Sequence, residues 1–541
     1  MAKTPKIKRR QFLAGAVAAG PVLGLAAASK AVAQPAPPRP SVPAVPPNEN
    51  VLPEVQPLNQ GRAGSDFMVD VIKTLDIDYV SCLPAATFRG LQESLLNYGM
   101  NKKPEFIMTL HEECAVAMAH GYYKVAKKPM ACLVHGTVGL QHASMAIYNA
   151  YADRAPMLVI SGNIQNEAAR RPNVEWNHSA LDQNAMVRDF TKWDAQPTSL
   201  QATADALVQA YDIMTTAPMA PVLVTIDADV QEETLEKREE AKLRIPKLRV
   251  HSQPQGEETA VREAARILAA AENPVIFVNR YGRTAKAPEM LVELAELLQA
   301  PVVDGRSRMN FPNRHKFNHT LRREQLFAQA DAILALEPVD LFGITDDVRD
   351  LIDRPNVKLN RQPNLKLIHI GTETLLMKAN YGDTQRYNYA DLSIAGDAEA
   401  TMPSLLAALR REISPARAAT LAQRGAMLAE MAPRLLEQSK AEAVYGWNAS
   451  PIAVARTCAE LWNVLKDEDW TFPNETVFLS DWPHRLWDFK QSHNWNGQSG
   501  AQGVGYNAPA ALGAALANKG SRRVTAAIVG DGEMMMTNTA L

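Results

Sequence analysis

Cysteine is scarce in this sequence, and its few residues are too far apart to suggest a metal cage. Cys82, Cys114, Cys132 and Cys458 form no C-x-x-C pair, which is the spacing expected of a cysteine-bound metal. Free, buried thiols are therefore predicted. A disulfide stays open as an alternative if the protein is exported, and then only for thiols that an oxidant can reach.

Aromatic residues and net charge are also low. Aromatics make up 6% of the 541 residues and the formal net charge is −2. The chain thus lacks the basic footprint and the stacking surface of nucleic-acid-binding proteins, and no nucleic-acid partner is expected. Its 46% hydrophobic and 21% charged residues are typical of a soluble globular protein and exclude collagen-like, coiled-coil and largely disordered chains. The length predicts three domains.

The N-terminal apolar run is too short for a convincing membrane span. Residues 12–29 carry no charge and are rich in Ala and Gly, which is typical of a signal peptide. The preceding Arg9-Arg10, followed by Gln11-Phe12-Leu13, resembles the twin-arginine export signal, and Ala31-Val32-Ala33 has the pattern of a cleavage site. We expect residues 1–33 to be removed before Gln34 and the mature protein to be periplasmic, without a stable membrane span. An uncleaved N-terminal anchor is the alternative.

The rest of the chain alternates short apolar runs with helical patterns. Residues 34–60 are rich in proline and predict an extended linker. From residue 61 the pattern is typical of α/β folds, and we predict three doubly wound parallel-sheet domains at 61–232, 250–405 and 445–541, the last truncated. Strands are predicted at 106–110, 130–134, 156–160, 221–226, 275–278, 301–303, 332–336, 367–370, 477–479 and 524–529, a charged linker at 232–249 and a polar helical stretch at 405–442.

Two positions combine the end of a predicted strand with residues that carry chemistry. Glu112 follows a strand and begins a helix, a position that faces the ligand crevice in open α/β sheets. Gly530-Asp531-Gly532 follows an apolar strand, where glycines let backbone N–H groups approach a phosphate and Asp531 could hold Mg²⁺. A simpler interpretation of each stays open, because Glu is favourable at any helix N-terminus and Asp and Gly are common in turns.

The motifs become specific through their combination and order. Along the chain they are Leu110-His111-Glu112-Glu113-Cys114-Ala115, Ala119-His120-Gly121-Tyr122, Asp153-Arg154-Ala155-Pro156-Met157, Asp182-Gln183 with Thr191-Lys192-Trp193, Ala220-Pro221-Val222-Leu223-Val224, Pro483-His484-Arg485-Leu486-Trp487, Gly505-Tyr506-Asn507-Ala508-Pro509 and Val529-Gly530-Asp531-Gly532. Together they resemble the thiamine-diphosphate enzymes of the acetolactate synthase type, over residues 61–541.

The resemblance implies a pyrimidine-binding, a central and a diphosphate-binding domain, with active sites shared in a homodimer or homotetramer. It implies thiamine diphosphate and Mg²⁺ as cofactors and a small 2-oxo acid as substrate. Glu112 would hydrogen-bond the cofactor's pyrimidine ring, Asp531 would hold Mg²⁺, and Val504 would be the apolar wedge that bends the cofactor, with a core valine as its alternative. The implied cofactor-binding residues are Glu112, Gly136, Thr137, His484, Val504, Gly505, Gly530, Asp531 and Gly532.

Departures from the family pattern narrow the expected function. His178-Ser179 stands where acetolactate synthases have Phe-Gln, and His135-Gly136-Thr137-Val138-Gly139 replaces their Ser-Gly-Pro-Gly turn, which argues against acetolactate formation itself. Glu112, His135 and His178 are the candidate catalytic residues. The two histidines could transfer protons, because histidine is the usual acid–base group near neutral pH. For each histidine the alternative is a purely structural role. The segment 279–283 contains less glycine than the corresponding segment of flavin-binding relatives, which argues against bound FAD.

The predicted function is a thiamine-diphosphate-dependent decarboxylation of a 2-oxo acid, with or without carboligation, by a lyase or transferase. Alternatives are another thiamine-diphosphate decarboxylase or lyase, a non-catalytic periplasmic binding protein, and a dehydrogenase. The last rests on the G-x-G-x-x-A match at 503–508, which no apolar strand precedes. In the family an Asn beyond the Gly-Asp-Gly completes the metal site. Because the chain stops before it, either the metal site is incomplete or, as we expect, the sequence is a fragment that binds cofactor poorly as written.

Overall fold

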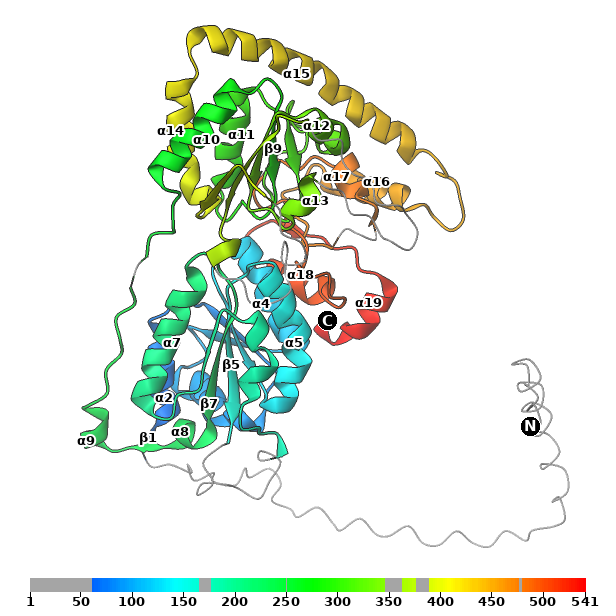
Figure 1. Ribbon diagram of the computed structural model, residues 1–541. Coiled ribbons are helices and arrows are strands. Elements are labelled where there is room, and N and C mark those ends of the chain that lie inside the picture. The colour runs from blue at the N-terminus through cyan, green and yellow to red at the C-terminus, as the bar shows by residue number, and fades with distance from the viewer. Residues whose placement is uncertain (1–60, 165–176, 250, 346–361, 376–388, 476–478) are drawn as a thin grey trace, which may run out of the picture. The chain divides into compact units, whose positions relative to one another are not determined.

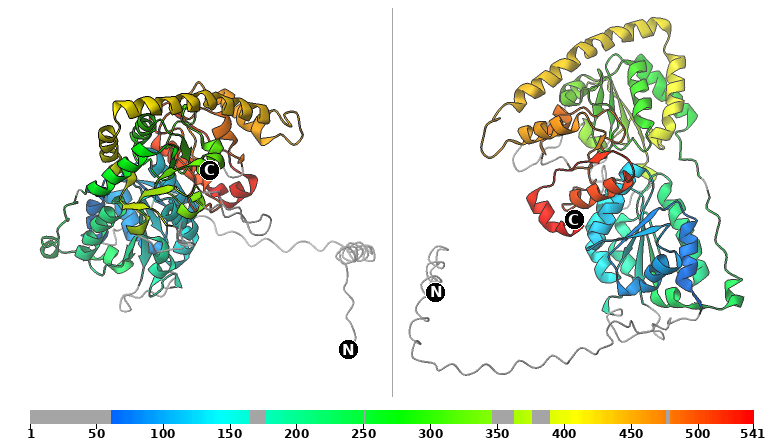
Figure 2. Two further views of the ribbon diagram at one scale, coloured as in Figure 1. Left: turned by 45° about the horizontal axis from the view of Figure 1, so that its top comes forward. Right: turned by 180° about the vertical axis from the view of Figure 1, so that it is seen from behind.

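The computed structural model describes residues 61–541 apart from 165–176, 250, 346–361, 376–388 and 476–478 (Figure 1). The predicted signal peptide and proline-rich linker, residues 1–60, lie outside the described residues. The described chain contains two large parallel sheets with helices on both faces and a smaller C-terminal region (Figure 1, Figure 2). The predicted α/β class is confirmed.

The first sheet has six parallel strands in the order β3-β2-β4-β5-β7-β6. The strands are β2 Tyr79–Cys82, β3 Glu105–Met108, β4 Ala131–Val134, β5 Leu158–Asn163, β6 Trp193–Ala195 and β7 Val222–Asp227, and the main helices are α2 Gly64–Lys73, α4 Glu112–Ala126, α5 Thr137–Ala152 and α7 Leu200–Thr215. Of these strands, β2 and β6 were not predicted, because their sequences contain too few consecutive apolar residues.

Alternate residues of the central strands face opposite cores. Leu133 of β4 packs with the apolar residues of α2 and α7, whereas Cys132 and Val134 pack with those of α4 and α5. Because successive side chains of a strand point to opposite faces, burial on both faces requires an unbroken apolar run. This explains why the strands β4, β5 and β7 could be predicted from sequence.

The second sheet has five parallel strands in the order β10-β9-β11-β12-β13. The strands are β9 Pro274–Val278, β10 Val302–Asp304, β11 Ala332–Leu336, β12 Lys366–Gly371 and β13 Leu392–Ala395, and the helices are α10 Glu258–Ala270, α11 Ala287–Leu298, α12 Arg323–Gln329, α13 Leu341–Thr345 and α14 Ala398–Glu412. Helices α10, α11 and α14 share one core with Ile276 and Val278, while Val275 and Phe277 pack with α12 and α13. The four strands predicted for this domain are confirmed.

The connections between the domains differ in detail from the prediction. The expected linker at 232–249 begins with strand β8 (Thr234–Leu235), which pairs antiparallel with β1 (Arg62–Ala63). The predicted helical stretch at 405–442 is two helices, because α14 ends at Glu412 and α15 (Pro415–Ala443) begins anew. Its start is fixed by the Ser414 side chain, which accepts a hydrogen bond from the Arg417 amide, and by Pro415 in the first turn.

The C-terminal region departs most from a doubly wound domain. It contains α16 Val454–Leu465, α17 Trp482–Leu486, α18 Asn507–Ala517, α19 Asp531–Met536 and the strands β14 Trp470–Thr471 and β15 Val524–Thr525. The predicted strand at 524–529 is wrong beyond Thr525, and the one at 477–479 lies mostly outside the described residues, with Leu479 in a helical turn. A strand needs neighbours for its backbone groups, and in the described part of the chain β15 pairs with the two residues of β14.

Helices α4 and α18 lie against each other backbone to backbone. A Cβ atom on Gly121 of α4 would lie 2.1 Å from the carbonyl oxygen of Ala510, and one on Gly513 of α18 would lie 1.9 Å from that of Met118. Both distances are far too short for any side chain, so both positions require glycine. The contact holds the C-terminal region on the helix that begins at Glu112.

All four cysteines are buried and free, as predicted. Within the ranges that the structure describes, we find no helix with the length and apolar character needed to cross a bilayer.

Candidate active site

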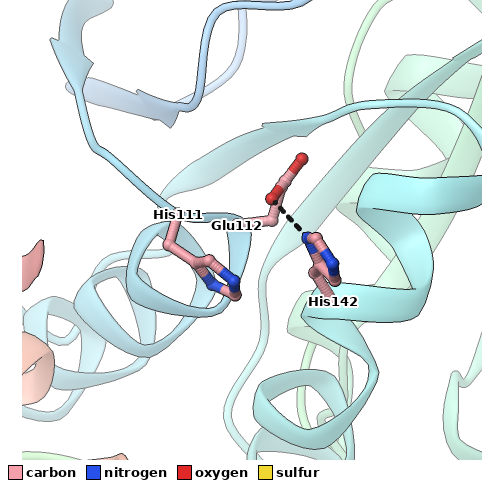
Figure 3. Close-up of side chains that lie close together, drawn as sticks. All are labelled: His111, Glu112 and His142. Atoms are coloured by element: carbon pink, nitrogen blue, oxygen red, sulfur yellow. Dashed lines mark hydrogen bonds and ion pairs between the residues drawn. The ribbon is translucent and has the colours of Figure 1, made fainter. Parts of the chain in front are cut away.

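Glu112 lies where the first sheet meets helix α4. Strand β3 ends at Met108, and His111 caps the helix by accepting a hydrogen bond on Nδ1 from the Glu113 amide at 3.2 Å. Glu112 follows directly, and the residue as a whole is only about 2% exposed. Its Oε2 atom is 3.3 Å from Nδ1 of His142, which projects from α5 (Figure 3). Burial of a carboxylate is costly unless it has partners, and Glu112 stays a candidate functional residue.

Gly139 places Glu112 beside the loop that begins helix α5. A Cβ atom at this position would lie 2.5 Å from Oε1 of Glu112 and 2.6 Å from Cβ of His135. Only glycine therefore allows the carboxylate and His135 to come so close. The structure thus brings together two residues that were predicted independently.

His135 and His178 form a hydrogen-bonded pair at the same loop. Nε2 of His135 lies 2.9 Å from Nδ1 of His178, with the rings edge to face. The backbone amide of Gly136 donates to Nδ1 of His135 at 2.9 Å and to Oγ1 of Thr87 at 3.0 Å, and the Thr137 amide donates to the carbonyl oxygen of His178 at 2.8 Å. The four predicted residues at positions 135, 136, 137 and 178 therefore form one cluster, with Thr87 as a member that the sequence did not reveal.

The hydrogen bonds assign the protons of this pair. An amide N–H can only donate, so Nδ1 of His135 is an acceptor and its neutral ring carries the proton on Nε2. That proton is donated to Nδ1 of His178, which leaves the proton of the His178 ring on Nε2. The donor direction of the pair therefore runs from His135 to His178.

Val504 and Gly505 lie close to the start of helix α4. The residue before them, Gly503, forms two hydrogen bonds with Asn149 of α5. Nδ2 of Asn149 donates to the Gly503 carbonyl oxygen at 3.2 Å, and the Gly503 amide donates to Oδ1 of Asn149 at 3.0 Å. Gly505 has φ of +105°, which requires glycine, and a Cβ atom there would lie 2.9 Å from Oε1 of Glu113. Val504 is about 53% exposed, as an apolar surface available to a ligand would be, and its alternative role as a core valine is wrong.

The Gly530-Asp531-Gly532 segment is open on one side. A Cβ atom on Gly530 or Gly532 would have no neighbour within 4 Å, and Asp531 is exposed at the start of α19. The next residue, Glu533, is buried and accepts hydrogen bonds from the backbone amide and from Nδ2 of Asn507 at 2.8 and 2.9 Å. Glu533 therefore ties the segment to the first turn of α18, a role that sequence reasoning missed.

The structure places His484 against the central domain. Its ring stacks on Phe489 and meets Trp495 edge to face, with centroids 4.6 and 4.5 Å away. In the described part of the chain neither ring nitrogen has a hydrogen-bond partner, and burial holds its pKa well below the usual value. The ring lines a cavity of about 300 Å³ together with Arg306 and Arg314. A role of His484 in cofactor binding stays a prediction.

A buried charge cluster joins helix α4 to the end of helix α5. Asp153, at the end of α5, accepts hydrogen bonds from Nε2 of His120 at 2.7 Å and from Nζ of Lys124 at 2.9 Å, and it pairs with Arg308 of the central domain. All four side chains are buried. Lys124 also donates to the carbonyl oxygen of Gln498 in the C-terminal region. The cluster therefore connects residues from all three domains, with Asp153 bound to Arg308 and Lys124 bound to Gln498.

His120 gives the stability of the protein a testable dependence on pH. Burial lowers the pKa of His120 to about 4, from an ordinary value of 6.5. As the pH falls from 6.5 to 4 the unfolded chain takes up a proton that the folded chain does not, which lowers the free energy of unfolding by about 1.4 kcal/mol per pH unit. In His120→Asn we expect urea unfolding to show a slope shallower by this amount in that window. An unchanged slope would contradict a buried, neutral ring.

Three family models match the chain. They are the N-terminal TPP-binding domain of thiamine pyrophosphate enzymes over residues 62–186, the central domain over 261–405, and the C-terminal TPP-binding domain over 478–541. The predicted active-site residues lie in the first and third of these ranges.

Relatives and solved structures agree with this assignment. An acetolactate synthase of Mycobacterium bovis is 25% identical over 489 residues, which cover 89% of this chain and 74% of that protein. A probable 2-ketoarginine decarboxylase of Pseudomonas aeruginosa is 26% identical over 506 residues, with coverage of 91% and 81%. The crystal structure of benzoylformate decarboxylase from Polynucleobacter necessarius superposes with a TM-score of 0.69 at 18% identity, covering 88% of this chain and 82% of that one. The chain belongs to the thiamine pyrophosphate enzymes, as its sequence motifs indicate.

Proposed function

We propose that this enzyme decarboxylates a small 2-oxo acid with thiamine diphosphate, releasing CO₂ and either an aldehyde or a carboligation product. The observation that carries the proposal is the buried carboxylate of Glu112, beside the His135–His178 pair. In the simple reaction the bond between the carbonyl carbon and the carboxylate breaks, CO₂ leaves, and a proton is added to that carbon. A carboligation replaces that proton by a bond to a second carbonyl compound.

The residues present fit the cofactor. Gly139 keeps the Oε1 edge of Glu112 clear, since a Cβ atom there would lie 2.5 Å from it, and this carboxylate would hold the pyrimidine ring. The open faces of Gly530 and Gly532 leave room for a diphosphate, and Asp531 would hold Mg²⁺, an ion that prefers carboxylate and phosphate oxygens. When bound, thiamine diphosphate supplies the carbon nucleophile and accepts the electron pair that decarboxylation releases.

His135 and His178 would deliver the proton that the product needs. Thr87 and the Gly136 amide hold the His135 ring, and the 2.9 Å bond between the rings aligns Nε2 of His178 as the terminal donor. The relay lies next to Glu112 through Gly139, so both groups can act on one bound substrate. Because imidazole changes its protonation state near neutral pH, it suits this transfer.

The proposal includes assembly into a homodimer or homotetramer. Large apolar side chains stand exposed around the start of α4, namely Met108, Leu110 and, on α5, Met145, at 65%, 58% and 45%. Covering these apolar side chains with a second subunit would be favourable, because it removes apolar surface from water and helps to exclude water from the site.

Binding of the cofactor tests the function most directly. We expect the full-length protein to bind thiamine diphosphate in isothermal titration with Mg²⁺ present, and to bind it much more weakly after chelation of the metal, because Asp531 and the diphosphate share the ion. The loaded protein should then release CO₂ from a panel of 2-oxo acids, and product analysis will show whether a second carbonyl compound is joined. Absence of metal-dependent binding would favour the non-catalytic alternative.

We also propose that the enzyme is periplasmic and is exported after folding around its cofactor, through Arg9-Arg10. Replacement of both arginines by lysine keeps the charge but changes the twin-arginine pair. We expect this variant to stay in the cytoplasm as an intact precursor, whereas the wild-type protein should reach the periplasm with Gln34 as its first residue. Cell fractionation and N-terminal sequencing measure both. Normal export of the lysine variant would support an ordinary basic flank of a membrane anchor instead, because there only charge matters.

A further inference from the structure

The side chains of His111 and His142 both lie close to the buried carboxylate of Glu112 (Figure 3). One ligand atom each from His111, Glu112 and His142 lies within 4.8 Å of the others. The two imidazole rings stack with their centroids 4.8 Å apart and their planes 20° from parallel. His111 comes from the start of α4 and His142 from the second turn of α5, so the contact between two helices, rather than one flexible loop, positions the set.

We propose that His111, Glu112 and His142 form a binding site for Zn²⁺, and that Zn²⁺ and thiamine diphosphate exclude each other there. Two imidazoles and one carboxylate, with a fourth position left open, are a ligand set that Zn²⁺ uses in proteins. Imidazole ligands favour Zn²⁺ and its transition-metal neighbours over Mg²⁺. The site is therefore distinct in chemistry from the oxygen-rich position expected at Asp531.

The spacing of the ligands fits a tetrahedral ion. Bonds of about 2.05 Å to zinc place two tetrahedral ligands about 3.3 Å apart, and Nδ1 of His142 already lies 3.3 Å from Oε2 of Glu112. His111 needs the larger adjustment, since its Nδ1 accepts the 3.2 Å bond from the Glu113 amide. Binding through either ring nitrogen gives up this one long hydrogen bond at most.

Glu112 is the buried ligand of this set, and His142 is the exposed one. The Glu112 side chain is 3% exposed and that of His142 is 58% exposed, so an ion can enter from the side of His142 and reach a charge that water screens little. Exclusion of thiamine diphosphate follows because a Zn²⁺ ion on Oε2 of Glu112 would neutralise the carboxylate whose Oε1 edge would hold the pyrimidine ring, and this part rests on the proposed function.

The binding experiment uses the full-length protein after removal of metals and cofactor. Isothermal titration with Zn²⁺, and the visible spectrum of added Co²⁺ as a probe of tetrahedral geometry, should both show one site per chain. We expect His142→Ala and His111→Ala each to weaken Zn²⁺ binding at least about 10-fold. His251→Ala is the matched control, because His251 is also half-exposed and paired with a carboxylate, Asp212, at 2.6 Å. Equal Zn²⁺ affinity in all three variants would overturn the site.

Competition is measured by release of Co²⁺ from the loaded protein. Thiamine diphosphate with Mg²⁺ should abolish the Co²⁺ spectrum at concentrations where inorganic diphosphate, which can chelate the ion but carries no pyrimidine, does not. Simultaneous binding of both would overturn the exclusion. If the protein binds no thiamine diphosphate at all, the proposed function fails, while the titrations of His142→Ala and His111→Ala still decide the metal site. Should an alanine variant misfold by circular dichroism, His142→Gln, which keeps polarity and removes the imidazole, replaces it.

Discussion

Replacement of Glu112 by Gln is expected to lower activity by a factor of about 10² to 10⁴ while the protein stays folded. The range is that of a positioned acid–base group, and the amide cannot exchange the proton that a carboxylate holds for the pyrimidine ring. The side chain is buried but has nearly the same size after the change, so packing is preserved. Proton–deuterium exchange at the thiazolium carbon of bound cofactor measures the effect at its source.

Glu113→Gln is the matched control for this variant. Glu113 is the next residue of the same helix turn, and it faces Gly505 rather than Gly139. Its amide variant should keep exchange and activity within a few-fold of the wild type. A wild-type exchange rate in Glu112→Gln would contradict the role proposed for that carboxylate, and equal losses in both variants would indicate a general effect on the helix start.

Asp153→Asn is expected to destabilise the protein by about 3–5 kcal/mol, the usual cost of leaving buried charges without their partner. Burial alone would raise the pKa of Asp153, but Arg308 and Lys124 outweigh burial and hold it well below the usual value. An amide in its place leaves two cations, both buried, without a counter-charge. Urea unfolding at pH 7 gives the change in free energy of unfolding.

A surface ion pair provides the comparison. Glu263 bonds Arg266 at 2.6 Å on the exposed side of α10, and Glu263→Gln should change the free energy of unfolding far less than Asp153→Asn, because solvent screens exposed ion pairs. If Asp153→Asn were as mild as this control, the buried cluster would contribute little, and its link between the domains would be a matter of geometry rather than of stability.

The sequence reveals most where local patterns decide the structure. The apolar runs that form β4, β5 and β11 are buried on both faces, so they can be recognised without knowledge of their neighbours. Glu112 could be recognised because it follows the apolar run of the edge strand β3 and begins a helix. The family motifs then identified the loop of His135 as part of the same site.

The features that could not be predicted depend on residues that are far apart in the sequence. Nothing local distinguishes Asp153 from a surface aspartate, because its partner Arg308 is 155 positions away. The same holds for Glu533, which was overlooked beside Asp531 although it caps α18. The predicted strand at 524–529 failed for a related reason, since an apolar run becomes a strand only where another strand pairs with it.

The glycine contact between α4 and α18 also bears on how the chain folds during synthesis. Roughly 380 residues separate the end of α4 from the start of α18, which a ribosome needs roughly 20 to 75 s to add. During this time the first domain can complete its sheet, yet the side of α4 around Gly121 has no partner from its own chain. Nascent chains would therefore expose this side of α4 for tens of seconds. A chaperone could bind it during that time, or it could pair prematurely with a neighbouring chain on the same messenger RNA.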